Sequence, residues 1–81
     1  MFDIDLKRDG EENLYTQIYE VIRAEILADK YTPDTKMPSI RKLASRLSVN
    51  AETVVKAYDL LAAENLIYKK EGSGSYIAPA A

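Results

Sequence analysis

The stretch KMPSIRKLASRLSVNAETVVKAY, residues 36–58, contains two short amphipathic segments separated by a polar break. Apolar residues recur in each segment at the three- and four-residue spacing of a helical face. We predict one helix over 40–47 after Ser39 as N-cap, and another over 51–64 after Asn50 as N-cap. Ser48 and Val49 form the turn between them. Two helices joined by so short a turn indicate a helix-turn-helix.

A longer amphipathic helix is predicted before this motif. It begins after Asn13, a favourable N-cap, and ends near Asp29, before the turn-forming residues 32–35. Its apolar positions recur at helical spacing: Leu14, Ile18, Val21, Ile22 and Ile26. Residues 1–12 are expected to form an extended arm, from which Ile4 and Leu6 can still pack on the body. Residue 37 is expected to lie in a short strand.

A β-hairpin is predicted after the third helix, which Asn65 ends because Asn tolerates left-handed backbone angles. Residues 67–70 and 75–77 read as strands, and residues 71–74 as their turn. The expected fold is mainly α with a small β part, a winged helix-turn-helix of three helices plus a C-terminal β-hairpin wing. The domain is expected over 13–78, after the arm (1–12) and before the start of a linker or tail (79–81).

The predicted core is one small cluster of apolar and aromatic residues. No ligand role is assigned to any of them: Leu14, Tyr15, Ile18, Tyr19, Ile22, Ile26, Leu43, Leu47, Val54, Tyr58, Leu61, Leu66, Tyr68 and Ile77.

Composition excludes several classes of function. The chain of 81 residues contains no cysteine and no histidine, which removes disulfides, thiol and imidazole catalysis and the usual zinc sites. No apolar run approaches the roughly 18 residues of a membrane span, and no signal peptide is recognisable. We therefore expect a cytoplasmic protein that is not an enzyme, binds no membrane and carries no cofactor in this chain.

The charge distribution points to nucleic acid although the net charge is −2. Residues 36–56 hold five basic side chains against one acidic, a net of +4, whereas residues 1–35 have a net charge of −5 and residues 57–81 of −1. Because charges are screened beyond about 8–10 Å at physiological salt, the interaction with a phosphate depends on the local charge and not on the net charge of the chain. A helix-turn-helix places the second helix of its motif, here the predicted third helix over 51–64, in the major groove of DNA, so a double-stranded DNA partner is expected.

Arg41 is the strongest candidate contact, since its guanidinium can grip a phosphate or the O6/N7 edge of guanine. The alternative is a surface arginine paired with a carboxylate of the same chain. Ser39 and Asn50 are expected to cap helices, and helix N-termini also bind phosphate. Thr53 can contact a phosphate through its hydroxyl or a thymine through its methyl group.

Charged residues of the two helices have two interpretations each. Glu52 either accepts from cytosine N4 or, as we favour, only suits the helix dipole. Lys56 either pairs with Glu52 one turn away or reaches a phosphate. Lys42 and Arg46 form a like-charge i,i+4 pair, whose repulsion slightly destabilises the helix. A nearby phosphate would relieve this repulsion; alternatively, both side chains simply lie on a solvated face.

The hairpin turn supplies the last candidates. Gly72 is most simply a turn residue, but it also lets a wing tip enter the minor groove, with Lys69 and Lys70 at its base. A nucleotide-binding glycine loop is disfavoured because no GxxxxGK[ST] pattern is present.

Four blocks carry a family resemblance: LYTQIYEVIRAEI, MPSIRKLASRLSV, TVVKAYDLLAAENLI and GSGSYI. In this order and spacing they resemble the DNA-binding domain of the GntR family of bacterial transcription regulators, over residues 14–78. The resemblance implies sequence-specific binding to palindromic operators, usually by a homodimer. It also implies that Arg41, which matches the arginine of the PS-x-R-x-L-A motif, contacts the operator. The sequence does not choose between a repressor and an activator.

Two subfamilies fit best. The segments 14–19 and 72–76 look MocR-like, and in that group the domain precedes a large aminotransferase-like domain that binds pyridoxal phosphate. The run 49–58 looks similar to the YtrA group, in which a short helical tail follows. The MocR-like assignment is slightly preferred.

The chain departs from the family pattern in two ways. Asp29, Asp34 and Asn65 stand where Gly is frequent, and Asp and Asn best tolerate left-handed φ. Ala51 and Val55 stand where many members carry basic residues. The acidic balance and the lack of arginine in the third helix motivate an alternative function, a winged-helix protein–protein interaction module. By themselves the 81 residues are expected to be monomeric, with weak non-specific DNA affinity.

Overall fold

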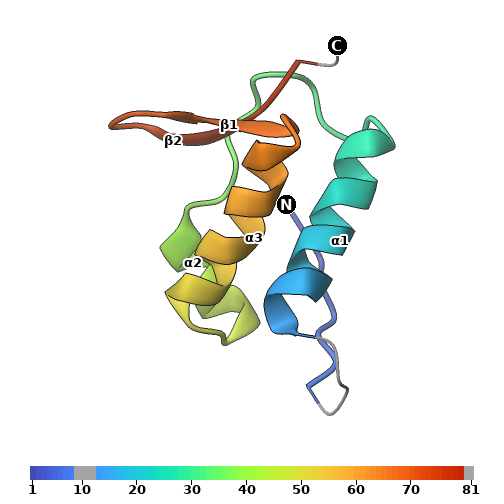
Figure 1. Cartoon of the computed structure of the whole chain (residues 1–81), viewed down its shortest axis with the longest axis vertical. Helices are drawn as coiled ribbons and strands as arrows, with labels where there is room; N and C mark the ends of the chain where they lie inside the picture. The colour runs from blue at the N-terminus through green and yellow to red at the C-terminus, as the bar shows by residue number, and fades with distance from the viewer. Residues whose placement is uncertain (9–12, 80–81) are drawn as a thin grey trace.

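Three helices and a hairpin make up the computed structural model, which describes residues 1–8 and 13–79. The elements in chain order are α1 (Leu14–Leu27), α2 (Ile40–Leu47), α3 (Ala51–Ala63), β1 (Ile67–Lys70) and β2 (Gly74–Ile77). In Figure 1, α1 and α3 lie side by side, α2 crosses the N-terminal part of α3, and the hairpin projects from the other end of α3. The predicted winged helix-turn-helix is confirmed.

All three predicted N-cap residues occupy the N-cap positions, and one of them caps its helix through its side chain. The Ser39 hydroxyl accepts a hydrogen bond from the Lys42 amide at 3.1 Å, so Ser39 caps α2 as expected. Asn13 and Asn50 occupy the N-cap positions of α1 and α3, but their side chains make no cap hydrogen bond. Their backbone carbonyls accept the first helical bonds instead, as in Thr53 N–H to Asn50 O at 3.0 Å. Helix α3 ends one residue earlier than predicted.

Left-handed backbone angles occur where the sequence places Asp and Asn. Asp29, Asp34 and Asn65 have φ of 57°, 67° and 60°, so these three residues take the left-handed conformation that glycine adopts most readily. Ser48 is also left-handed, with φ of 56°, and it ends α2. The sequence pattern indicates a turn at Ser48 but not this conformation.

The wing is a two-stranded antiparallel hairpin. Its register pairs Ile67 with Ile77 and Lys70 with Gly74, so β2 begins one residue earlier than predicted. Lys36 forms an isolated bridge with Tyr76, and the segment before α2 thus lies along the outer edge of β2. The short strand expected at residue 37 is not formed. A single bridge at Lys36 takes its place, and Met37 N–H donates to Ser75 O at 2.8 Å beside it.

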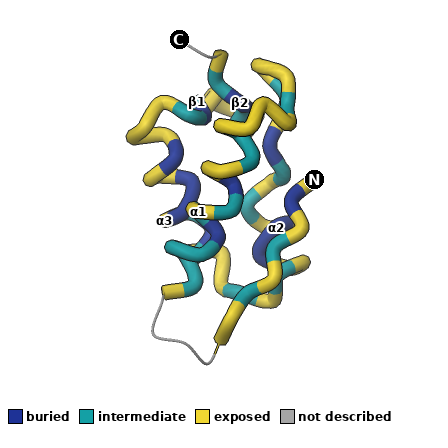
Figure 2. The backbone as a smooth tube through the Cα atoms, turned by 90° about the vertical axis from the view of Figure 1, so that its right-hand side faces the viewer, coloured by how far each residue is buried: buried dark blue, intermediate teal, exposed yellow. Residues whose placement is uncertain are grey.

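The core lies between α3 and the elements that surround it, and Figure 2 shows its buried positions on the inward sides of the helices. Its members are Phe2, Ile18, Ile22, Met37, Leu43, Ala44, Val54, Ala57, Tyr58, Leu61, Ile67 and Ile77. Tyr19, Ile26, Leu47 and Leu66 are only partly buried against this cluster. Leu14, Tyr15 and Tyr68 were predicted as core but are half-buried at its margin, because they belong to the ends of the helix and hairpin.

The arm contributes a core residue that was not predicted. Phe2 is 1% exposed, and its ring meets the edge of Tyr31 at a centroid distance of 5.2 Å and an interplanar angle of 70°. The Tyr31 hydroxyl donates to the Met1 carbonyl at 2.9 Å and also lies within hydrogen-bond distance of Glu25. Burial and this carboxylate raise the pKa of Tyr31 to about 12. Ile4 and Leu6 pack against the core as expected.

Polar contacts also fasten the arm to the helices. Arg46 donates to the Phe2 carbonyl at 2.6 Å, and Arg8 donates to the carbonyls of Leu47 and Ser48 at the end of α2. A cation at a helix C-terminus is favourable because it compensates the unpaired carbonyls there. Residues 9–12 of the predicted arm, and residues 80 and 81 of the predicted linker, lie outside the described residues.

Tyr58 is the buried polar link between α3 and the segment before α2. Its hydroxyl donates to the Pro38 carbonyl at 2.7 Å, and its side chain is 4% exposed. Burial raises the pKa of Tyr58 above its ordinary value, with the nearby Arg46 guanidinium opposing the shift. The phenol is therefore neutral in the folded chain well above pH 10.

This shift predicts alkaline destabilisation. Above about pH 10 the unfolded chain loses the Tyr58 proton while the folded chain keeps it, so the free energy of unfolding falls by about 1.4 kcal/mol per pH unit for this group. In Tyr58→Phe this contribution is absent, and stability at neutral pH is lower by about 1 kcal/mol through the lost hydrogen bond. Urea unfolding at a neutral and several alkaline pH values measures both effects. Equal pH slopes for the two proteins would contradict the prediction.

Candidate nucleic-acid interface

Seven exposed cations lie on α2, α3, the wing and the segment before α2. They are Lys36, Arg41, Lys42, Arg46, Lys56, Lys69 and Lys70. Within residues 1–8 and 13–79, the one ion pair joins Arg23 to Glu64, so no carboxylate of these residues neutralises the seven. Uncompensated cations on neighbouring elements produce a local positive potential in a chain whose net charge is −2.

Arg41 stands in the first turn of α2, two residues after the cap Ser39. It is exposed, and no hydrogen bond or ion pair joins its guanidinium to another described residue. The intramolecular carboxylate considered as the alternative for Arg41 is therefore not found among the described residues. Lys42 follows directly and is also exposed. The three predicted residues Ser39, Arg41 and Lys42 thus share one turn of α2.

A hollow of about 550 Å³ separates the N-terminal ends of α1 and α3. It brings together four predicted residues of α3 and its cap with the start of α1, and its lining consists of Asn13, Leu14, Tyr15, Asn50, Glu52, Thr53 and Lys56. Thr53 is half-buried, while Asn50, Glu52 and Lys56 are exposed. The hollow is polar and lies at the helix ends whose amide groups favour anions.

Lys56 does not form the ion pair with Glu52 that their spacing allows. Its ammonium instead lies 5.6 Å from the centroid of the Tyr15 ring, a cation–π distance. Tyr15 was predicted to lie in the core, and its contact with Lys56 depends on how α1 packs against α3. The Glu52 carboxylate stays exposed in the first turn of α3, where it suits the helix dipole.

The wing tip is open, and Lys70 at its base lies over the aromatic ring of Tyr76. Gly72 has φ of 78°, and a Cβ built there meets no atom within 4 Å, so glycine is required by the backbone angle and not by crowding. The Lys70 ammonium lies 5.9 Å from the centroid of the Tyr76 ring. Tyr76 stacks on Tyr68 at 5.6 Å, and the Tyr68 hydroxyl donates to Asp34 at 2.6 Å. The base of the wing is thereby tied to the loop before α2.

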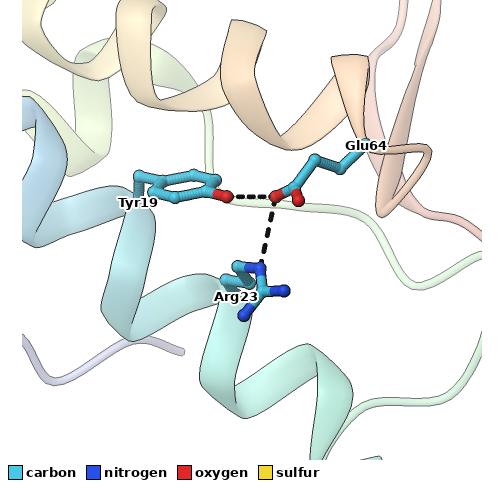
Figure 3. A network of polar contacts seen from close by, with 3 residues as sticks. All are labelled: Tyr19, Arg23 and Glu64. Atoms are coloured by element: carbon cyan, nitrogen blue, oxygen red, sulfur yellow. Dashed lines mark hydrogen bonds and ion pairs between the residues drawn. The ribbon is translucent and has the colours of Figure 1, made fainter.

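A separate polar cluster fixes α1 against the opposite end of α3, as Figure 3 shows. The Tyr19 hydroxyl and the Arg23 guanidinium, at 3.3 Å, both contact Oε1 of Glu64, the C-cap residue of α3. The hydrogen bond to this carboxylate raises the pKa of Tyr19. A carboxylate at a helix C-terminus is unfavourable, and the two donors offset that effect. These side chains are engaged with one another and lie far from the N-terminal end of α3, so we assign them no ligand.

Metal sites and membrane spans are not found in the part of the chain that the structure describes. No group of three or more acidic side chains is placed to hold a metal ion there. None of the helices in that part is both long enough and apolar enough to span a membrane.

The predicted site residues therefore form three groups. Ser39, Arg41 and Lys42 lie on α2, and Asn50, Glu52, Thr53 and Lys56 on α3 and its cap. Lys70 and Gly72 lie on the wing. Lys36 and Tyr15 join these groups in the structure but were not among the candidates. Lys36 already belonged to the basic segment of the sequence, whereas no pattern in the sequence separates Tyr15 from a core tyrosine.

Comparisons with known proteins identify relatives of this architecture. The family described as "Bacterial regulatory proteins, gntR family" matches residues 14–77. The chain is 41% identical over 73 residues to the probable rhizopine catabolism regulatory protein MocR of Rhizobium meliloti, an alignment that covers 90% of this chain and 15% of that protein. The chain spans between 14% and 16% of the length of the first curated relatives it matches.

Solved structures show the same likeness. YtrA from Sulfolobus acidocaldarius, a GntR-family transcription factor, superposes with a TM-score of 0.87 at 33% identity, over 96% of this chain and 82% of that one. The DNA-binding domain of AraR, solved in complex with operator ORE1, superposes with a TM-score of 0.78 at 29% identity, over 96% of this chain and 95% of that one. Because the family match covers most of the residues and the fold agrees, the chain belongs to the GntR family of bacterial regulatory proteins.

Proposed function

We propose that this chain binds an operator in double-stranded DNA as the DNA-binding domain of a bacterial transcription regulator. In this proposal α3 enters the major groove and the wing touches the adjacent minor groove. The observation that carries it is the set of exposed cations without carboxylate partners on α2, α3 and the wing. The likeness to an AraR domain solved with its operator supports it.

Within this proposal each group of residues has a distinct role. Arg41 grips a phosphate or a guanine edge, and Lys42 lies beside it on the same turn. Ser39 and Asn50 position the N-terminal ends of α2 and α3 on phosphates. Thr53 and Lys56 contact the backbone from the hollow between α1 and α3, where the Tyr15 ring holds the Lys56 ammonium.

Sequence discrimination by α3 is expected to depend on small and apolar contacts. Ala51 and Val55 offer methyl groups, which favour thymine, because the methyl group of thymine is the apolar feature of the major groove. Glu52 is exposed in the same turn and can accept from cytosine N4. Lys70 and Gly72 on the wing supply charge and close approach rather than base-specific contacts.

The wider protein is proposed to be a cytoplasmic, non-enzymatic regulator that binds a palindromic operator as a homodimer. A MocR-like protein would carry pyridoxal phosphate, which forms a Schiff base with a lysine in an enclosed site. Every lysine of this chain is exposed, so its residues do not fit that cofactor. The cofactor, if used, would belong to a domain outside this chain.

The test is DNA binding by fluorescence anisotropy with duplexes selected from a random pool. Contacts with about four phosphates predict an affinity loss of about 100-fold between about 50 and 200 mM salt. A scrambled duplex of equal length is expected to bind more weakly at both salt concentrations. A protein–protein interaction module, the alternative function, would show neither duplex preference nor a steep salt slope. Failure to select any duplex, even with two chains tethered, would overturn the proposal.

A further inference from the structure

A second hollow, of about 410 Å³, lies where the segment before α2, the helix itself and the start of the arm meet. Three of its lining side chains are cations, Lys36, Lys42 and Arg46, and none is acidic. The remaining lining residues are Met1, Met37, Pro38 and Ser39. We call this hollow the α2 pocket. It is distinct from the hollow between α1 and α3, which shares no residue with it.

The walls of the α2 pocket are held from several directions. Arg46 donates to the Phe2 carbonyl at 2.6 Å, which ties its guanidinium to the arm. Pro38 is anchored from below by the buried Tyr58 hydroxyl at 2.7 Å. Lys36 is bridged through its backbone to Tyr76 of the wing. The pocket is therefore built from three parts of the chain that other contacts keep in place.

Gly74 lets Lys36 lie against the wing. A Cβ built on Gly74 would come within 3.4 Å of Cε of Lys36, and Gly74 has φ of 129°, which side chains rarely adopt. The stem of Lys36 thus lies against the start of β2, while Lys36 also lines the α2 pocket. This one lysine therefore connects the wing with the pocket beside α2.

The three cations repel one another, and the Phe2 carbonyl to which Arg46 donates carries no net charge that could offset them. Lys42 and Arg46 lie one helical turn apart, a like-charge spacing that destabilises a helix slightly. No carboxylate among residues 1–8 and 13–79 forms an ion pair with any of the three. An arrangement of lysine, lysine and arginine around a hollow with no acid matches a phosphate group, whose oxygens accept several charge-assisted hydrogen bonds.

We propose that the α2 pocket binds a phosphate of the DNA backbone, through Lys36, Lys42 and Arg46, between the positions contacted by Arg41 and by the wing. This rests on the proposed operator binding and extends its contact surface. Free phosphate presents similar oxygens, but the pocket is continuous with the first turn of α2 and with the wing. A backbone phosphate would therefore reach it in the same docking that brings Arg41 to the duplex.

The test compares Lys36→Gln with the matched control Lys30→Gln. Both changes remove one exposed lysine, and Lys30 lies after α1 and lines neither of the two hollows. In anisotropy titrations Lys36→Gln is expected to lower the slope of log affinity against log salt by about one phosphate contact, and to weaken binding about fivefold to tenfold at about 0.1 M salt. Lys30→Gln is expected to match the unsubstituted chain. Circular dichroism melting confirms that both variants fold.

The outcomes separate this inference from the proposed function. Equal slopes for Lys36→Gln, Lys30→Gln and the unsubstituted chain, with DNA binding intact, overturn the α2 pocket alone. No DNA binding by the unsubstituted chain overturns both. Titration with inorganic phosphate at constant ionic strength, followed by amide NMR shifts, distinguishes the source. Saturable shifts at Lys36 and Lys42 at low millimolar phosphate would assign the pocket to the free anion and overturn the backbone assignment.

Discussion

Arg41→Ala is expected to weaken binding to the selected duplex by about tenfold to a hundredfold at constant salt, which corresponds to about 1–3 kcal/mol. Arg41 is exposed at the start of α2 and has no partner among the described residues, so its fork is free for the ligand. A bidentate contact with guanine would also relax the preference at one base pair, whereas a phosphate contact would weaken all duplexes alike. Anisotropy with the selected and scrambled duplexes measures both.

Two further variants sharpen this experiment. Arg41→Lys keeps the charge but loses the planar fork, so it is expected to recover only part of the affinity. Arg23 of α1 is exposed, as Arg41 is, but it pairs with Glu64 at the end of α3. Arg23→Ala is therefore expected to leave DNA binding unchanged. Unaltered affinity for Arg41→Ala would remove the first turn of α2 from the interface.

Phe2→Ala is expected to destabilise the fold by about 3 kcal/mol and to lower the melting temperature by more than about 10 °C. Phe2 is 1% exposed and packs edge-on against Tyr31, so truncation leaves a cavity under the arm. The loss is large for a domain of 81 residues, whose stability margin is thin. Thermal and urea unfolding followed by circular dichroism give the change directly.

The control for this prediction is Asp5→Ala, which removes an exposed side chain of the same arm. It is expected to change stability by less than about 0.5 kcal/mol. Similar melting curves for Phe2→Ala and the unsubstituted chain would show that the arm does not contribute to the core in solution. The hydrogen bond between Arg46 and the Phe2 carbonyl would then not be maintained either, and the α2 pocket would lose one of its walls.

The helices and the wing were predictable because their signals are local. Ser39 caps α2 through the amide three residues later, and Asp29 and Asn65 take left-handed angles that few residues tolerate. Such interactions span at most one or two helical turns and therefore follow from neighbouring residues. The same holds for the groups of candidate residues, since Ser39, Arg41 and Lys42 share a turn whatever surrounds them. Their contacts with DNA stay predictions.

The structure decided which of several available partners a side chain takes. Lys56 has Glu52 one turn away, yet its ammonium lies over Tyr15 because α1 packs beside α3. Tyr15 was predicted to lie in the core, but its place at the start of α1 leaves the ring at the rim of a hollow. A periodic pattern predicts which face of a helix is apolar, but it does not predict at which residue that face stops being buried.

By itself the sequence determined the order of the helices and strands, the basic segment, and which positions of α2 and α3 carry its charged residues. Periodicity, caps and charge are properties of contiguous residues. Tertiary structure alone decided that Phe2 enters the core and that Lys36, Lys42 and Arg46 surround one hollow. The contact between Arg46 and Phe2 joins residues 44 positions apart, and that between Arg8 and Leu47 joins residues 39 apart. Contacts at such separations form only when the chain closes on itself, and no local pattern encodes them.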